Sequence, residues 1–183
     1  MNKYALPVQA KIGMQVYDLQ ADYREILQIF SYLEDPELPE VLRWRIALGL
    51  FYEQEIPQAD MPQAMEYLAE FLRCGEPEGK PGPKLLDWQQ DADAIIAGVN
   101  KVAGQEVRAL SFVHWWTFLS WFHSIGQGQL STIVSLRDKL RRGKKLEAWE
   151  KDFYRENKAR VDLKPRLSRQ EQEEKQRLQA LIG

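Results

Sequence analysis

Residues 109–126, ALSFVHWWTFLSWFHSIG, constrain the fold of this chain more than any other segment. They include three of the six tryptophans and three phenylalanines, and they contain no Asp, Glu, Lys or Arg. Four apolar residues recur at helical spacing on one face, namely Phe112, Trp115, Leu119 and Phe122. Other apolar residues cover most of the remaining surface, and a helix that is apolar on nearly every side has to be buried.

The interior that buries this helix is expected to be a protein core rather than a membrane. The segment lies at the lower limit of the length that spans a bilayer. Its polar residues would lie at several depths of a bilayer, and the rest of the chain is polar and charged. Ser111 is a suitable N-cap and Gly126 a suitable final residue, as in an ordinary core helix.

Composition limits the class of protein and its location. A chain of 183 residues suits one domain with its own core, and a formal net charge of -2 gives no global field that attracts nucleic acid. The single cysteine, Cys74, excludes an intramolecular disulfide and a cysteine-rich zinc site. Residues 1–13 lack the apolar stretch of a signal peptide, and no segment is expected to cross a membrane. We therefore expect a protein of the reducing cytoplasm.

Periodicity and caps predict a mainly α fold, a compact bundle of about seven helices with a small N-terminal β-hairpin. The hairpin is expected within residues 6–19, with its turn near Ile12 and Gly13. Besides the aromatic segment, helices are expected at about 22–33, 39–53, 60–74, 87–103, 131–142 and 146–158, three of them with capping boxes that begin at Asp22, Asp60 and Asp87.

Two of these helices have apolar stripes that predict their buried faces. The second helix carries Val41, Trp44, Leu48, Phe51 and Tyr52 on one side, and the third carries Met61, Met65, Leu68 and Leu72. Residues 1–163 are expected to form a single domain, with an exposed Pro/Gly loop at 75–83. Residues 164–183 are expected to form a polar helical tail that frays or awaits a partner.

The sequence offers little catalytic or metal-binding chemistry. His114 and His123 are nine positions apart, so on one helix they point in different directions and cannot share a metal. They are more simply explained as polar residues of a largely buried helix that find hydrogen-bond partners. The motifs of hydrolases, nucleotide-binding loops and zinc proteases are absent from the chain. We expect a non-enzyme without cofactor or metal.

One run of basic residues forms a local concentration of positive charge, and it has two explanations. The run could bind phosphates, which makes a nucleic-acid-binding accessory protein the alternative function. It could equally end one helix, where cations offset the helix dipole, and face the acids Glu147, Glu150 and Asp152 of the next. The run consists of Arg137, Lys139, Arg141, Arg142, Lys144 and Lys145.

Several segments carry a family resemblance: LFYEQEIP, FLRCG, LLDWQQDADAIIAGVNKVAG, VHWWTFLSWFHSIG and LSTIVSLRDKLRRGKKLEAWEKDFYREN. Together they resemble a family of siphophage and prophage proteins encoded in the tail-morphogenesis cluster beside the tape measure gene. The resemblance runs from the hairpin to Leu163, and the combination of HWWTF with GKK and WE is specific.

The resemblance implies a tail assembly chaperone of the host bacterial cytoplasm. Such a chaperone binds the long, aggregation-prone tape measure protein before the tail tube polymerises around it, and is absent from the finished virion. The tail tube protein is a second candidate partner, and self-association stays open, as does membership of a frameshifted chaperone pair. No catalytic residue, metal or cofactor goes with this family.

Five residues are the candidate partner-binding site: Lys144, Lys145, Trp149, Phe153 and Tyr154. They combine basic and aromatic side chains in one short segment, which suits contact with another macromolecule. The alternative is that Trp149 and Phe153 pack into the core, as apolar residues at i, i+4 commonly do.

Overall fold

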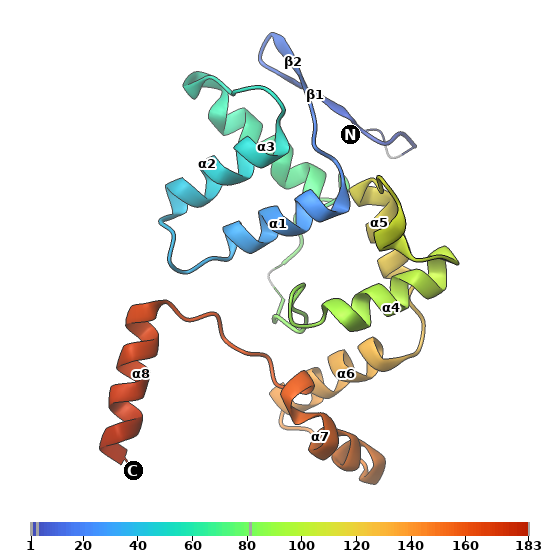
Figure 1. Ribbon diagram of the computed structural model, residues 1–183, viewed down its shortest axis with the longest axis vertical. Coiled ribbons are helices and arrows are strands. Elements are labelled where there is room, and N and C mark those ends of the chain that lie inside the picture. The colour runs from blue at the N-terminus through green and yellow to red at the C-terminus, as the bar shows by residue number, and fades with distance from the viewer. Residues whose placement is uncertain (1, 3, 81, 183) are drawn as a thin grey trace. The chain divides into compact units, whose positions relative to one another are not determined.

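The computed structural model describes residues 2, 4–80 and 82–182, without some side chains near the C-terminus. In this part of the chain it contains eight α-helices, two short 3-10 helices and an N-terminal two-stranded hairpin, which confirms the predicted mainly α fold (Figure 1). The chain divides into two compact units. Unit 1 comprises residues 1–78 and 165–183, and unit 2 comprises residues 79–164. The division falls within the Pro/Gly stretch at 75–83, and the prediction of a single domain over 1–163 stays a prediction.

The hairpin of unit 1 lies where alternation predicted it. Strands β1 (Gln9–Ile12) and β2 (Gln15–Asp18) pair antiparallel, with Ile12 opposite Gln15. Gly13 occupies the tight turn with φ of 58°, a left-handed conformation that glycine adopts without steric cost. Its N–H donates to the Gln63 side chain at 2.8 Å, so Gln63 holds the hairpin turn and does not complete the predicted capping box with Asp60.

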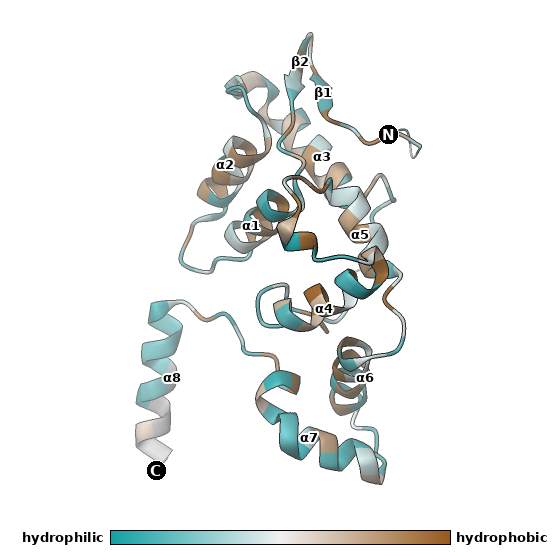
Figure 2. Ribbon diagram, turned by 45° about the vertical axis from the view of Figure 1, so that its right-hand side comes forward, coloured by the Kyte–Doolittle hydropathy of each residue, from teal (hydrophilic) through white to brown (hydrophobic). Residues whose placement is uncertain are grey.

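The helices of unit 1 follow the predicted boundaries closely. Asp22 caps the first of them, because its carboxylate accepts a hydrogen bond from the Arg24 N–H at 2.9 Å. Figure 1 shows the first two helices side by side, joined by a short loop. The elements are α1 (Tyr23–Leu33), α2 (Glu40–Phe51), η1 (Gln58–Asp60), α3 (Met61–Leu72) and α8 (Arg169–Ile182). Helix α8 is the predicted polar tail, and Figure 2 shows most of it as hydrophilic.

The core of unit 1 joins the hairpin to α2 and α3. Leu19 forms a β-bridge with Tyr52 just after α2, and the buried Tyr52 hydroxyl donates to the Ala64 carbonyl at 3.0 Å. Burial raises the pKa of Tyr52, since the phenolate would lose its hydration there. Phe51 and Phe71 lie with ring centroids 4.8 Å apart at the centre of this core.

Two of the predicted buried stripes are wrong in part. Val41 is 81% exposed, and Met61 and Met65 are only half-buried. The residues that α3 buries fully are Ala64, Leu68 and Phe71. They lie on a part of the helix surface adjacent to the predicted methionines. Periodicity correctly predicts an apolar surface on each helix, but part of that surface is not covered by another element of the described structure.

Unit 2 contains four longer helices and a 3-10 turn. Helix α4 ends where predicted, at Gly104, which has φ of 70° and donates its N–H to the Asn100 carbonyl. Asp87 accepts from the Gln90 N–H as its capping box predicted, although regular helix begins a few residues later. The elements are α4 (Ala92–Ala103), η2 (Val107–Ala109), α5 (Trp115–His123), α6 (Gln129–Arg141) and α7 (Ala148–Val161).

The aromatic segment forms a core helix, but a shorter one than predicted. Helix α5 starts after His114, whose buried Nδ1 accepts the Trp116 N–H at 3.1 Å, so His114 and not Ser111 is the N-cap. The helix ends at His123, before Gly126. Phe112 lies outside it and is 54% exposed, while Trp115 and Phe118 are fully buried and stacked. Of the polar residues of the segment, His114 thus caps the helix, while Ser120, His123 and Ser124 face solvent toward its C-terminal end.

Candidate functional site

A concave surface of unit 1 lies between α2 and α3, and we call it the α2–α3 groove. Its volume is about 750 Å³, within the range of sites that bind ligands or side chains of a partner. Most of its lining is apolar. The lining residues are Glu40, Val41, Trp44, Arg45, Leu48, Glu55, Ile56, Pro57, Gln58, Met61 and Met65.

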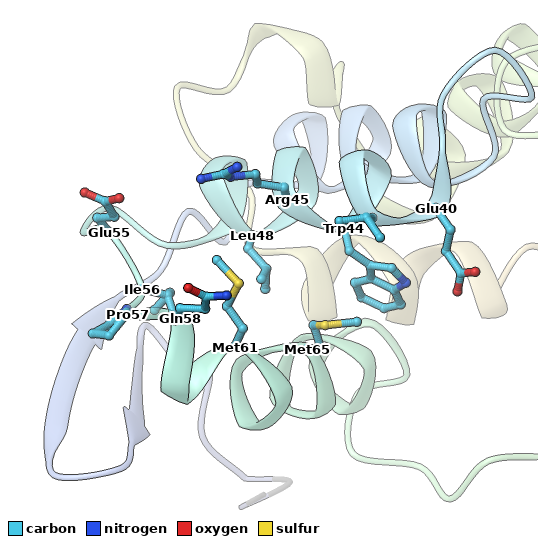
Figure 3. A pocket seen from close by; sticks show the side chains of 11 residues that line it. Glu40, Trp44, Arg45, Leu48, Glu55, Ile56, Pro57, Gln58, Met61 and Met65 are labelled. Atoms are coloured by element: carbon cyan, nitrogen blue, oxygen red, sulfur yellow. The ribbon is translucent and has the colours of Figure 1, made fainter.

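The side chains of α2 and α3 face one another across this groove. Figure 3 shows Trp44 and Leu48 pointing down from α2 toward Met61 and Met65 on α3. Leu48 and Ile56 are buried at the floor, whereas Trp44 and both methionines keep part of their surface open to solvent. Methionine side chains are unbranched and polarisable, so a surface that contains them adapts to differently shaped apolar partners.

The groove continues past the end of α2. A smaller hollow of about 230 Å³ shares Leu48, Ile56 and Met61 with it and adds Gly49 and Gln54. Because Gly49 has no side chain and nothing lies within 4 Å of the position of a Cβ there, this end of the groove is open.

The acidic character of the surrounding sequence distinguishes the groove from the rest of the chain. Residues 1–78 hold 14 Asp and Glu against 6 Lys and Arg, a formal charge of -8. Residues 79–164 hold 10 against 15, a formal charge of +5. The groove therefore belongs to a strongly acidic part of a chain that is nearly neutral as a whole.

The basic run of the sequence is largely engaged in ion pairs within unit 2. Arg137 is buried, and its guanidinium donates to both carboxylate oxygens of Asp91, at 2.6 and 2.9 Å. It also donates to the carbonyls of Leu85, Arg160 and Val161 at 2.7 to 2.9 Å. Arg137 thus connects three segments of the unit and does not face solvent.

Three more members of the run have acidic partners. The Lys139 Nζ donates to the buried Glu150 carboxylate at 2.6 Å, and this hydrogen bond lowers the pKa of Glu150. Arg141 and Arg142 both contact Asp138, at 3.0 and 2.9 Å. Lys144 and Lys145 are exposed and form no ion pair with any residue that the structure describes.

The five predicted partner-binding residues lie in one short segment but differ in exposure. Trp149 is 56% exposed near the start of α7, not far in sequence from the exposed Lys144 and Lys145. Phe153 and Tyr154 instead pack against the buried cluster of Ile133, Leu136 and Val161. The Tyr154 hydroxyl also donates to Asp162 at 2.8 Å. Three of the five side chains, Lys144, Lys145 and Trp149, are therefore exposed within one short segment, which we call the patch, and whether it binds a partner stays a prediction.

Each buried titratable residue in the described part of the chain has a structural partner. His114 caps α5, Asp91 holds Arg137, Glu150 accepts the Glu147 N–H and Lys139, and Asp87 accepts two backbone N–H groups of the turn before α4. Among the same residues no group of three or more His, Cys, Asp or Glu is placed to hold a metal ion. None of the described helices has both the length and the apolarity needed to cross a bilayer.

The groove itself is not predictable from apolar periodicity. Val41, Trp44, Met61 and Met65 have the periodicity of buried residues, and periodicity alone does not distinguish a core from an open groove. Residue type offers one signal, since methionines are over-represented at adaptable binding surfaces.

Comparison with known proteins gives the family. Residues 4–163 match the family model described as Bacteriophage Gp15 protein. The chain belongs to this bacteriophage family. No curated protein and no solved structure matches the chain. The predicted relationship to a phage protein is thereby confirmed, while its position beside the tape measure gene stays a prediction.

The part of the chain shared with the Gp15 family contains both candidate surfaces. The α2–α3 groove and the patch of Lys144, Lys145 and Trp149 lie within residues 4–163, whereas α8 lies beyond them. Both surfaces thus lie in the part of the chain that matches the family model.

Proposed function

We propose that this Gp15-family protein is a non-catalytic chaperone of phage tail assembly. It binds the tape measure protein in the host cytoplasm before the tail tube polymerises, and it leaves before the virion is complete. Membership of a bacteriophage family supports the phage context. The tape measure protein is proposed as the partner because of the resemblance of the sequence to proteins encoded beside the tape measure gene.

The observation that carries the proposal is the open apolar groove between α2 and α3. A chaperone of a long, aggregation-prone protein has to cover apolar side chains of that protein reversibly. Trp44, Met61 and Met65 offer partly exposed apolar surface in a concave site, a form that suits the apolar face of a partner helix. The absence of catalysis is proposed because the buried titratable residues have structural partners.

The alternative of nucleic-acid binding has less support. Arg137, Lys139, Arg141 and Arg142 are engaged by acids, which leaves Lys144 and Lys145 to attract phosphates. Two exposed lysines release few counterions, so binding through them would be weak and would fall as salt rises. Binding to an apolar partner segment would instead persist in salt.

Co-expression with the neighbouring tail proteins tests the function. We expect the tape measure protein to stay soluble and to co-purify with this chain in buffer of high ionic strength, whereas expression of the tape measure protein alone yields aggregates. If another tail protein is kept soluble and the tape measure protein is not, the proposed partner is wrong.

Two sets of substitutions show which surface is responsible. Trp44→Ala with Met65→Ala changes the groove, and Lys144→Ala, Lys145→Ala and Trp149→Ala together change the patch. We expect the groove variant to lose most of the solubilising effect at unchanged secondary structure. A loss that occurs with the patch variant alone would assign tape measure binding to the patch.

A further inference from the structure

The α2–α3 groove has an acidic side chain at each end. Figure 3 shows Glu40 at the end beside Trp44, and Glu55 at the opposite end beyond Leu48. Arg45 lies at the rim on α2 and, together with Glu55, also lines the smaller hollow at that end. Helix α2 has 12 residues and is therefore about 18 Å long at 1.5 Å per residue, enough to lie along a partner helix of similar length.

The loop before α2 extends the acidic field at the Glu40 end. Residues 34–40, EDPELPE, contain four acids and no base. Within unit 1 this loop already holds basic groups of the chain itself, because Glu34 pairs with the Arg166 guanidinium at 3.5 Å. Glu37 accepts the Arg169 N–H at the start of α8. Acids of this loop thus already receive a guanidinium and the positive end of a helix from the chain itself, and Glu40 is the acid of this stretch that lines the groove.

The floor of the groove offers apolar contact between these charged ends. Trp44 and Leu48 are one turn apart on α2, and Met61 and Met65 are one turn apart on α3. Each pair projects toward the other in Figure 3. Two facing rows with one-turn spacing match the apolar positions i, i+3, i+4 and i+7 of a helix that lies between them.

We propose that the α2–α3 groove binds one amphipathic helix of a partner protein, apolar along one face and carrying Lys or Arg at both ends of that face. The apolar face contacts Trp44, Leu48, Met61 and Met65. The basic residues pair with Glu40 at one end and with Glu55 at the other. This inference rests on the proposed function only for the identity of the partner protein. The groove itself selects a helix by its apolar face and its basic ends.

A set of three fluorescently labelled helical peptides of equal length tests this inference with the full chain. The first has leucines at i, i+3, i+4, i+7 and i+11 with lysines at both ends, the second replaces those lysines with glutamates, and the third keeps the lysines but scrambles the leucine positions. Fluorescence anisotropy at low salt measures each dissociation constant. We expect the lysine peptide to bind on the order of tenfold more tightly than the glutamate peptide, and the scrambled peptide to bind weakest.

Matched variants locate the binding. Glu40→Gln with Glu55→Gln should remove most of the preference for lysine, and Trp44→Ala should weaken all binding. Leu42→Ala is the control, because Leu42 is exposed on α2 and does not line the groove. Circular dichroism of each variant checks that the fold is kept.

Several results would overturn the inference. Equal affinity for the lysine and glutamate peptides would exclude the charge selection, and binding that survives Trp44→Ala would place the site elsewhere. Concentration-dependent self-association that Trp44→Ala abolishes, without binding of any peptide, would assign the groove to a second copy of this chain. If the lysine peptide binds as expected while the tape measure protein is not solubilised, the groove's selectivity stands and the proposed tail function fails.

Discussion

Arg137 in α6 and Asp91, the residue that precedes α4, form a buried bidentate ion pair. The exposed fractions of their side chains are 4% and 2%, and the two nitrogen-to-oxygen distances are 2.6 and 2.9 Å. Three backbone carbonyls accept the remaining guanidinium hydrogens, so the charged group is fully hydrogen-bonded. A planar guanidinium is suited to this arrangement, because it donates in several directions at once.

Asp91→Ala should therefore destabilise the protein strongly. The substitution leaves the Arg137 guanidinium buried without its counter-charge, a change that typically costs about 3–5 kcal/mol. Urea unfolding followed by circular dichroism measures the loss. Arg155→Ala is the control, since Arg155 and Asp152 form an exposed pair and such pairs contribute little. A similar free energy of unfolding for both variants would show that the buried pair is not needed for stability.

Trp115 and Trp149 should respond differently to truncation, since one is 1% and the other 56% exposed. Trp115→Ala leaves a cavity beside Trp88 and Phe118 and should cost about 3–5 kcal/mol. Trp149→Ala should change the free energy of unfolding little, because most of that indole already contacts solvent. Chemical unfolding of the two variants gives the comparison, and a well-tolerated Trp115→Ala would contradict a core role for α5.

The helices can be predicted from sequence because their signals are local. Asp22 at an N-cap, Gly104 at a C-terminus and the turn at Gly13 each act on backbone within a few residues. The length of α5 is overestimated because the apolar run continues through Phe112, while the His114 cap that starts the helix depends on one side-chain hydrogen bond.

The functional surfaces are harder to predict because they depend on contacts distant in sequence. Arg137 has the pattern of a surface cation beside other cations, and its partner Asp91 lies 46 residues away. Met61 and Met65 have core periodicity, and only the packing of α2 against α1 and α3 leaves them at an open groove. The exposed patch of Lys144, Lys145 and Trp149 is within reach of sequence reasoning, because its residues lie in one short segment.

Two helical glycines should respond to alanine with opposite signs. A Cβ at Gly98 in α4 would lie 2.7 to 3.1 Å from three atoms of the branched Ile125 side chain. Gly98→Ala should thus destabilise by about 1–3 kcal/mol through overpacking, less the gain in helix propensity. No atom lies within 4 Å of the position that a Cβ at Gly49 in α2 would occupy, so Gly49→Ala should raise the free energy of unfolding by about 0.5–1 kcal/mol. Thermal unfolding of both variants measures the signs, and equal signs would contradict the packing described around Gly98.

Cys74 should be a poorly reactive thiol in the folded protein. Burial, with a smaller contribution from the Glu76 carboxylate, raises the pKa of Cys74 from 9.0 to about 11. Since the thiolate is the reactive form, alkylation by iodoacetamide at pH 8 should be slow in the folded protein and should rise with pH toward 11. Unfolding in urea should accelerate it sharply. The folded state also keeps the thiol proton that the unfolded state releases near pH 9, so this group's contribution to stability is present below pH 9 and is lost as the pH rises through about 11. Equal alkylation rates with and without urea at pH 8 would show that Cys74 is not shielded.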